Sequence, residues 1–224
     1  MQRFVYGRRQ SQRLRPGRRR LLAEVLPKVE LALPESGGID PGQLFADGRP
    51  LWLEIGFGGG EHLAAQAAAH PDRGLIGCEP YITGVARLLA IAETEGLTNL
   101  RVVVDDARLL LAALPDGCLE RIFVLFPDPW PKVRHHKRRI VNPTTAAEFA
   151  RLLQPGGELR LATDDMPYAR AMLLALQPVQ QLRWLADTAA DWRSRTPDWP
   201  ATRYEEKARA ARRSCVYLRF QRIL

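Results

Sequence analysis

The sequence has few cysteines and few histidines, and their arrangement excludes several kinds of site. The three cysteines are widely spaced, at Cys78, Cys118 and Cys215. An odd number at such spacing predicts neither a disulfide framework nor pairs of zinc ligands, and free thiols are typical of a reducing compartment. The four histidines form no metal-binding pattern and no Ser/His/Asp or Cys/His pattern with their neighbours. We therefore expect no metal and no covalent nucleophile, in a cytoplasmic protein.

Long hydrophobic runs are also lacking. No run approaches the roughly 20 residues that span a bilayer, so no membrane contact is expected. Residues 1–20 do not resemble a secretory signal, because they hold eight arginines and no acidic residue. We expect residues 1–20 to be a flexible basic arm and residues 21–224 to form a single domain. An organellar transit peptide is the less favoured interpretation of the arm.

The positive charge is clustered. The net charge is +8 over 224 residues, and the arginines of residues 1–20 equal the whole excess. A second cluster covers residues 132–139, and a third, residues 203–213, is diluted by Glu205 and Glu206. Each cluster alone is most simply a solvated surface, but three clusters in one chain favour a nucleic-acid partner.

Short apolar runs alternate with helical patterns from residue 51 onward. We expect strands over 51–55, 74–78, 100–104, 121–126, 158–162 and 214–223, and helices over 21–33, 61–69, 83–95, 107–114, 143–153 and 166–176. Residues 187–200 are expected to form a loop. The alternation predicts an α/β fold with a doubly wound, mostly parallel sheet and helices on both faces. Ligands of such sheets bind beyond the carboxyl ends of the strands.

A glycine-rich loop follows the first expected strand. Glu54 precedes Gly56, Gly58 and Gly60, a spacing that permits close approach of the backbone to a ligand. The dinucleotide fingerprint would need glycine at position 61, where Glu61 stands, so a nicotinamide oxidoreductase is disfavoured.

Acidic residues stand at the ends of the first three strands. Glu54 suits an ammonium group, Glu79 suits ribose hydroxyls, and Asp106 suits the amino group of an adenine. Ordinary helix caps are the simpler interpretation of Glu79 and Asp106. Taken together with the glycine loop, the three acids fit S-adenosylmethionine, an adenosine with an amino-acid end.

The fourth strand leads into a turn that combines an acid, a ring and cations. Asp128 lies between prolines, Trp130 follows, and five lysines or arginines lie within residues 131–139. A carboxylate can read the hydrogens of a base, a ring can stack on it, and cations can hold its phosphates. The turn therefore predicts a place where a nucleobase is held for chemistry; a proline turn with a surface aspartate is the alternative.

These motifs resemble those of the bacterial tRNA (guanine-N7)-methyltransferase family over nearly the full length. The resemblance includes residues 53–60, Glu79, Asp106, residues 126–139, Asp164 and residues 202–205. It implies a seven-stranded class I methyltransferase sheet, S-adenosylmethionine as the cofactor and tRNA as the partner.

The resemblance also assigns roles residue by residue. Asp128 is implied to be catalytic. The implied cofactor residues are Glu54, Gly56, Gly58, Gly60, Glu79, Asp106 and Asp128. The implied substrate residues are Lys132, Asp164, Thr202, Arg203, Tyr204 and Glu205. The implied RNA-binding residues are Arg134, His135, His136, Lys137, Arg138 and Arg139.

The expected reaction transfers a methyl group to guanine N7 in the variable loop of tRNA. N7 carries a free lone pair, so no general base is needed, and Asp128 would stabilise the developing charge or position the guanine. The alternatives are an exocyclic amino methyltransferase acting on RNA and a catalytically silent RNA-binding module. The oligomeric state is expected to be a monomer or a homodimer.

Overall fold

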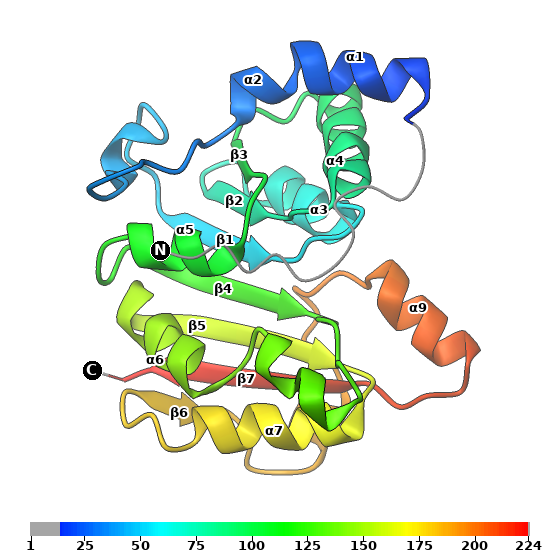
Figure 1. The fold of residues 1–224 in the computed structure, drawn as a ribbon. Helices are drawn as coiled ribbons and strands as arrows, with labels where there is room; N and C mark the ends of the chain where they lie inside the picture. The colour runs from blue at the N-terminus through cyan, green and yellow to red at the C-terminus, as the bar shows by residue number, and fades with distance from the viewer. Residues whose placement is uncertain (1–13, 224) are drawn as a thin grey trace.

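The structure is a computed structural model that describes residues 14–223. Within that range, seven strands form one sheet in the order β3-β2-β1-β4-β5-β7-β6 (Figure 1). The strands are β1 (Leu51–Ile55), β2 (Gly74–Cys78), β3 (Leu100–Val103), β4 (Leu119–Leu125), β5 (Leu153–Thr163), β6 (Leu182–Trp184) and β7 (Val216–Arg222). The first five are parallel, whereas β7 runs antiparallel to both β5 and β6. The predicted doubly wound, mostly parallel sheet is confirmed.

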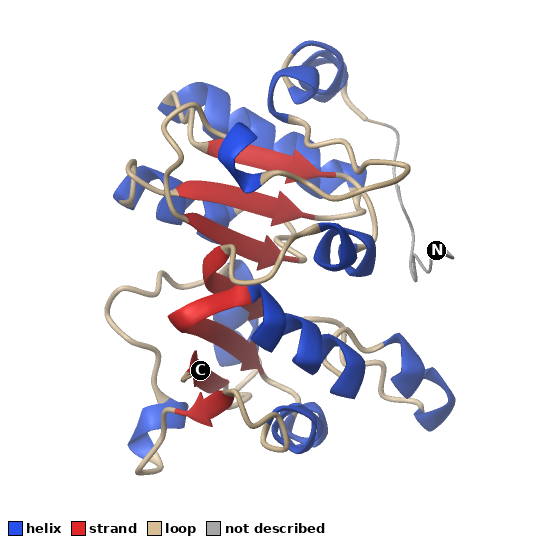
Figure 2. Cartoon of the chain, turned by 90° about the vertical axis from the view of Figure 1, so that its left-hand side faces the viewer, coloured by secondary structure: helices blue, strands red, loops and turns tan. Residues whose placement is uncertain are grey.

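Helices flank both faces of this sheet (Figure 2). They are α1 (Pro16–Glu24), α2 (Leu26–Val29), α3 (Glu61–Ala69), α4 (Ile82–Glu95), α5 (Ala107–Ala113), α6 (Pro143–Leu152), α7 (Met166–Leu176), α8 (Ala190–Arg193) and α9 (Arg203–Ala210), with 3-10 turns η1 (Pro41–Gln43) and η2 (Val133–Arg138). No helix between residues 14 and 223 has the length and apolar character needed to cross a membrane.

Alternate residues of the inner strands enter two separate cores. Leu53 and Val124 belong to the core that α5, α6 and α7 cover, while Trp52 and Phe123 belong to the core under α3 and α4. This alternation follows from the two-residue period of a strand, and it explains why the strands read as continuous apolar runs in the sequence. Two buried faces fix the register of the sheet and hence the positions of the loops at its carboxyl edge.

The expected boundaries are largely confirmed, with differences at both ends of the domain. The helix expected over 21–33 starts earlier, at Pro16, because proline is favoured in the first turn, and it is interrupted at Val25. Residues 14–20 of the expected arm are therefore partly helical, and residues 1–13 lie outside the described residues. The sequence did not predict β6, α8, α9 or the two 3-10 turns, all of which are short.

Candidate active site

The glycine loop connects β1 to α3 and approaches two other elements closely. Gly58 has φ 57°, a conformation that favours glycine, and a Cβ there would stand 3.1 Å from the ring of Tyr204. A Cβ on Gly84, in the first turn of α4, would overlap the carbonyl oxygen of Gly58. Gly84 was not singled out in the sequence, because a glycine inside a helical pattern carries no signal of such contact. The loop is thus pressed between α4 and α9.

Glu79 follows β2 and supports the glycine loop. Its carboxylate accepts hydrogen bonds from the backbone N–H groups of Gly58 and Tyr81, each at 2.9 Å. Burial raises the pKa of Glu79 above its usual value, partly opposed by these two N–H donors. Each oxygen keeps a second acceptor position, so the carboxylate can still receive a ligand hydroxyl.

Asp106 caps α5 and also faces the same edge of the sheet. Its carboxylate accepts hydrogen bonds from the backbone N–H of Arg108 at 3.0 Å and from the Arg108 guanidinium at 3.2 Å. The helix-cap interpretation of Asp106 is therefore confirmed, and the cofactor interpretation stays compatible because the residue lines the cavity described below.

The turn after β4 holds Asp128 in an unusual backbone. Phe126 has φ 50° and Trp130 has φ 45°, a region that bulky residues rarely adopt. The buried Arg139 donates from Nε to the carbonyl of Pro129 at 2.7 Å. The Trp130 ring contacts His135 edge-on, with centroids 5.9 Å apart, and the Arg138 guanidinium, 4.9 Å from its centroid. These contacts fix the exposed Asp128 at one position on the sheet edge.

A cavity of about 380 Å³ joins these elements at the carboxyl ends of β1 to β4. Its lining comprises Ile55, Gly56, Gly58, Cys78, Glu79, Pro80, Tyr81, Asp106, Ala107, Arg108, Phe126, Pro127, Asp128, Trp130, Arg138, Ile140 and Tyr204. The expected cofactor residues Gly56, Gly58, Glu79, Asp106 and Asp128 are thus brought together. Within residues 14–223, no group of three or more His, Cys, Asp or Glu side chains is arranged to hold a metal ion.

Glu54 and Gly60 do not line this cavity. Glu54 is 3% exposed, and its carboxylate lies 2.8 Å from Nδ1 of the buried His62. The other ring nitrogen of His62 lies 3.3 Å from the amide nitrogen of Gln66, so a neutral imidazole can donate to Glu54 and accept from Gln66. In this arrangement Glu54 orders the start of α3, whose N-cap is Gly60.

The segment η2 forms one rim of the cavity and carries most of the expected RNA residues. Lys132, Arg134 and Lys137 are exposed, and His135 and His136 are half-buried. Desolvation and the surrounding cations hold the pKa of His135 below its usual value, so its imidazole is neutral at neutral pH. Arg139 differs, because it is only 6% exposed and its guanidinium packs 4.7 Å from the ring centroid of Tyr168. The expectation that Arg139 contacts RNA is not supported by this position.

Helix α9 forms the opposite rim and contains most of the expected substrate residues. Thr202 caps the helix by accepting from the N–H of Glu205, and both residues are buried. Glu205 pairs with Arg195 at 3.2 Å and with Arg209 at 2.5 Å, so its role in this structure is internal. Among the four expected substrate residues Thr202 to Glu205, Arg203 and Tyr204 are exposed, and of these four Tyr204 alone lines the cavity.

The remaining expected substrate residues lie near these rims. Lys132 precedes η2, and Asp164 follows β5. The Asp164 carboxylate pairs with Arg213 Nε at 2.6 Å, which places it beside the turn after α9.

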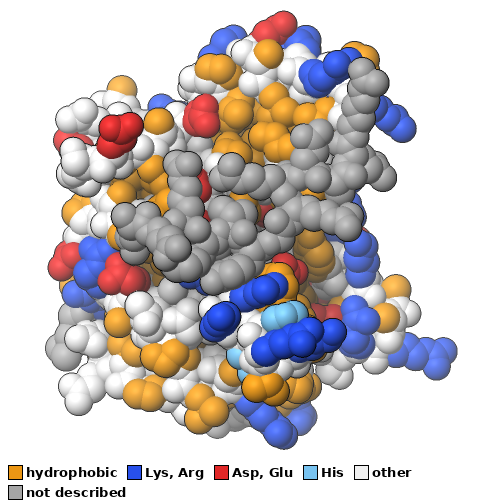
Figure 3. Space-filling view, viewed as in Figure 1, with side chains coloured by type: hydrophobic (Ala, Val, Ile, Leu, Met, Phe, Trp, Pro, Cys, Tyr) orange, Lys and Arg blue, Asp and Glu red, His pale blue; other side chains and the backbone are white. Residues whose placement is uncertain are grey.

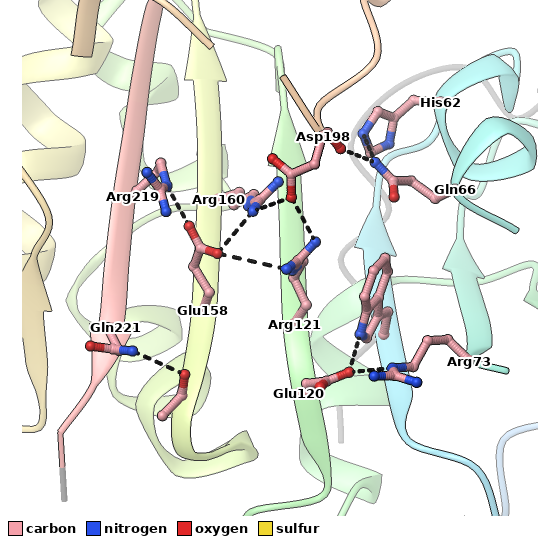
Figure 4. Close-up of polar contacts among 12 residues, drawn as sticks. His62, Gln66, Arg73, Glu120, Arg121, Glu158, Arg160, Asp198, Arg219 and Gln221 are labelled. Atoms are coloured by element: carbon pink, nitrogen blue, oxygen red, sulfur yellow. Dashed lines mark hydrogen bonds and ion pairs between the residues drawn. The ribbon is translucent and has the colours of Figure 1, made fainter. Parts of the chain in front are cut away.

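A polar network anchors the chain that leads into α9 (Figure 4). The buried Arg160 of β5 donates to Asp198 at 2.8 Å and to Glu158 at 3.0 Å, and Arg121 of β4 lies 3.4 Å from Asp198. Partial burial acts to raise the pKa of Asp198, but the hydrogen bond and charge of Arg160 outweigh it and hold the pKa well below its usual range. The carbonyl of Asp198 also accepts from Gln66 of α3 at 3.2 Å.

Trp199 adds an apolar anchor to this network. It is 1% exposed, packs edge-on against Tyr217 at 5.5 Å between centroids, and its carbonyl accepts from Arg195 at 2.6 Å. The sequence suggested only a loop here, although a tryptophan between prolines in a loop is a signal of such an anchor. Together, Asp198 and Trp199 attach α9 to the sheet.

Comparisons with known proteins agree with this geometry. A family model described as putative methyltransferase matches residues 48–218. A tRNA (guanine-N(7)-)-methyltransferase of Rhodospirillum rubrum is 52% identical, covering 97% of this chain and 87% of that protein. One of the same description from Zymomonas mobilis is 43% identical, covering 99% of this chain and 95% of that protein.

Solved structures share the fold at low identity. A 16S rRNA methyltransferase superposes with a TM-score of 0.53 at 15% identity, covering 78% of this chain and 88% of that chain. A 30S ribosomal methyltransferase from an uncultured bacterium gives 0.52 at 13% identity, covering 86% and 98%.

Proposed function

The chain belongs to the tRNA (guanine-N7-)-methyltransferase family, and on this premise we propose that it transfers a methyl group from S-adenosylmethionine to guanine N7 in tRNA. The proposed acceptor is a guanosine of the variable loop. A cytoplasmic location and a monomeric or homodimeric state stay predictions of the sequence.

The observation that carries the proposal is the turn 126–130. It holds one carboxylate, Asp128, at the mouth of the cavity that Glu79 and the glycine loop also line. Trp130 lies beside Asp128 in the same lining, so an acceptor for base hydrogens and a ring for stacking face one space. Basic side chains of η2 stand next to this turn.

The cavity fits the proposed cofactor. Gly58 and Gly56 allow a ligand to approach the backbone, and the second acceptor positions of the Glu79 carboxylate suit ribose hydroxyls. Asp106 stands at the end of β3, where it suits the amino group of an adenine. Bound S-adenosylmethionine supplies a methyl group on a positively charged sulfur. Glu54 would act on the loop through His62 and α3.

The protein's own contribution to the reaction is alignment and electrostatics. With the cofactor bound, the lone pair of guanine N7 would form the new bond to the methyl carbon as the carbon–sulfur bond breaks, so the protein's residues would need to move no proton. The purine gains positive charge, which the Asp128 carboxylate stabilises while accepting hydrogen bonds from the base. Trp130 and Tyr204 both line the cavity, where their rings would reduce the access of water to the reacting atoms.

The proposed RNA surface surrounds the cavity mouth. Lysines and arginines gather at the lower right of the face in Figure 3, over η2 and α9. We assign Lys132, Arg134 and Lys137 of η2 and its cap to phosphate contacts, because their side chains are exposed. Arg139 is left out of this surface and is assigned to holding the turn.

One experiment tests the proposed function. The protein is incubated with methyl-labelled S-adenosylmethionine and unmodified tRNA, and the labelled base is mapped. We expect 7-methylguanosine at one variable-loop position. Label on an exocyclic amino group would favour the alternative RNA methyltransferase, and tRNA binding without label would favour a silent RNA-binding module.

A further inference from the structure

A second cavity, of about 530 Å³, lies on the other side of α9. It is lined by Met166, Trp192, Arg193, Arg209, Arg213, Ser214, Cys215, Val216 and Tyr217. Helix α9 gives Tyr204 to the first cavity and Arg209 to the second, and side chains five residues apart on a helix point about 140° apart. Val216 pairs with Thr163 at the carboxyl end of β5, so both cavities open at the same edge of the sheet.

The lining of the second cavity combines guanidinium groups with an aromatic ring. It holds three arginines and, among the residues that the structure describes there, no carboxylate. The Arg193 guanidinium lies 4.9 Å from the ring centroid of the half-buried Trp192. Arg209 and Arg213 each pair with one carboxylate, yet their side chains stay 63% and 54% exposed. Each guanidinium group therefore keeps N–H donors that can face a phosphate.

The turn between α9 and β7 is also strained. Arg212 has φ 55°, an uncommon conformation for a non-glycine residue, and it presents Arg213 and Ser214 to the cavity. Arg213 pairs with Asp164, which follows β5 and is an expected substrate residue of the first site. Asp164 does not line the first cavity, so this ion pair places the second cavity beside the carboxyl end of β5.

We propose that the second cavity binds a nucleotide of the tRNA adjacent to the methylated guanosine, with its base on Trp192 and its phosphates on Arg193 and Arg213. The proposal rests on the proposed function, since it takes tRNA as the ligand. A stacking ring beside arginines is the usual composition of a site for unpaired nucleotides. An unpaired neighbour held here would pull the target guanosine across α9 toward the first cavity.

The test compares tRNA affinity over a salt titration for wild type, Arg193→Ala, Trp192→Ala and Trp192→Phe. We expect Trp192→Ala to weaken binding about fivefold or more, with Trp192→Phe closer to wild type because it keeps a stacking ring. Arg193→Ala should lower the log–log salt slope by about 0.7–0.9 if it removes one phosphate contact. Affinity for S-adenosylmethionine should stay unchanged.

Arg183→Ala is the matched control. Arg183 is an exposed arginine on β6 that donates to Gln221, at the opposite end of the sheet. If Arg193→Ala and Trp192→Ala bind tRNA with the same affinity and salt slope as this control and wild type, the subsite is wrong. Affinity for free guanosine monophosphate is measured for the same variants. If Arg193→Ala and Trp192→Ala lose this affinity but keep wild-type affinity for tRNA, the cavity does not hold a nucleotide of the tRNA and the proposal is also overturned. Wild-type methylation of tRNA in the same experiment separates failure of the subsite from failure of the proposed function.

Discussion

At the scale of single residues, the two strained aromatics around Asp128 are the most informative feature. A bulky residue in the left-handed region costs about 1–3 kcal/mol and persists only where its surroundings determine it. Phe126 is held by its N–H, which donates to the carbonyl of Ala162 at 2.8 Å, and Trp130 is held by contacts with His135 and Arg138. The turn is therefore organised before a ligand arrives, which suits a site that works by alignment.

Asp128→Ala is expected to lower kcat by about 10²–10³-fold, with a much smaller change in tRNA affinity, because the lost interaction strengthens only as charge develops on the purine. Asp128→Asn should fall between, since it keeps an acceptor and loses the charge. Single-turnover rates with both ligands saturating provide the measurement, with the exposed Glu35→Ala as the control. A near wild-type rate for Asp128→Ala would refute the electrostatic role.

Glu79 predicts a pH dependence of cofactor affinity. In the proposed site the ionised carboxylate would accept ligand hydroxyls. Its pKa lies above the usual 4.5, so affinity for S-adenosylmethionine should start to fall on acidification at a higher pH than an ordinary carboxyl would give. The unliganded fold behaves oppositely: a raised pKa contributes stability below the usual value and loses it as pH rises through the raised one. Calorimetric titration with S-adenosylmethionine at a series of pH values checks the affinity, and thermal unfolding over the same series checks the stability.

Glu79→Gln is the matched variant for this measurement. It should bind the cofactor more weakly at neutral pH, and it should lack the acid-dependent step. An identical pH profile for the variant and wild type would assign the titration to another group.

At the scale of elements, the cations of η2 and its two caps have two different roles. Lys132, Arg134 and Lys137 face solvent, whereas Arg139 holds the turn. Replacing Lys132, Arg134 and Lys137 with alanine is expected to weaken tRNA binding and to lower the salt slope by about 0.7–0.9 for each lost phosphate contact. The modified base should stay the same, because phosphate contacts position RNA without reading it.

Arg139→Ala serves as the contrast within the same prediction. Its buried guanidinium holds Pro129, so the loss should appear in kcat and in the thermal midpoint, with little change in salt slope. Parallel salt slopes for the triple variant and wild type would show that the exposed cations of η2 are an ordinary solvated surface.

The attachment of α9 gives another element-scale prediction. Asp198→Ala removes the acceptor of Arg160 and loosens the chain before α9, so Tyr204 should lose its fixed place against Gly58. We expect the KM values for S-adenosylmethionine and tRNA to rise about five- to tenfold, with a small drop in the thermal midpoint. Asp116→Ala, which removes a surface pair with Arg151 at 2.7 Å, is the control. Equal kinetics for the two variants would show that the network is structural only.

At the scale of the whole molecule, the sequence predicted what depends on local pattern. The first two strands, 51–55 and 74–78, are confirmed residue for residue, because each is a fully buried apolar run between turn residues. The glycine loop, Glu79, Asp106 and Asp128 were expected together, since the carboxyl ends of parallel strands share one edge. These inferences needed no knowledge of distant contacts.

The site features that could not be predicted from the sequence depend on contacts between distant segments. Glu54 was expected at the ligand but pairs with His62, and Glu205 was expected at the substrate but pairs with Arg195 and Arg209. Nothing in a run of residues distinguishes a carboxylate that faces a ligand from one that pairs with another side chain inside the fold. The Asp198 anchor joins residues 38 positions apart, so it could only emerge from the folded chain.

The expected basic arm, residues 1–20, leads to a prediction that compares two truncations. Removing residues 1–13 should lower tRNA affinity and its salt slope, because this segment holds four arginines and no acidic residue. Removing residues 1–20 should also lower the thermal midpoint, since it deletes the first turns of α1 and the Arg20–Glu93 ion pair at 2.5 Å. The measurements are tRNA binding and thermal unfolding of both truncations. Unchanged tRNA affinity in both would show that the arm does not contribute to RNA binding.

The position of β7 has a consequence for synthesis on the ribosome. β7 follows every other described strand in the chain, yet it lies inside the sheet between β5 and β6. The parallel strands β1 to β5 can assemble as the chain emerges, but β6 pairs only with β7 and must wait for it. Helix α9 and Tyr204 lie after β5 and before β7 in the chain, so the cofactor cavity would gain this wall only after β5 has been made. A nascent chain would then be unable to methylate before α9 is in place beside the glycine loop.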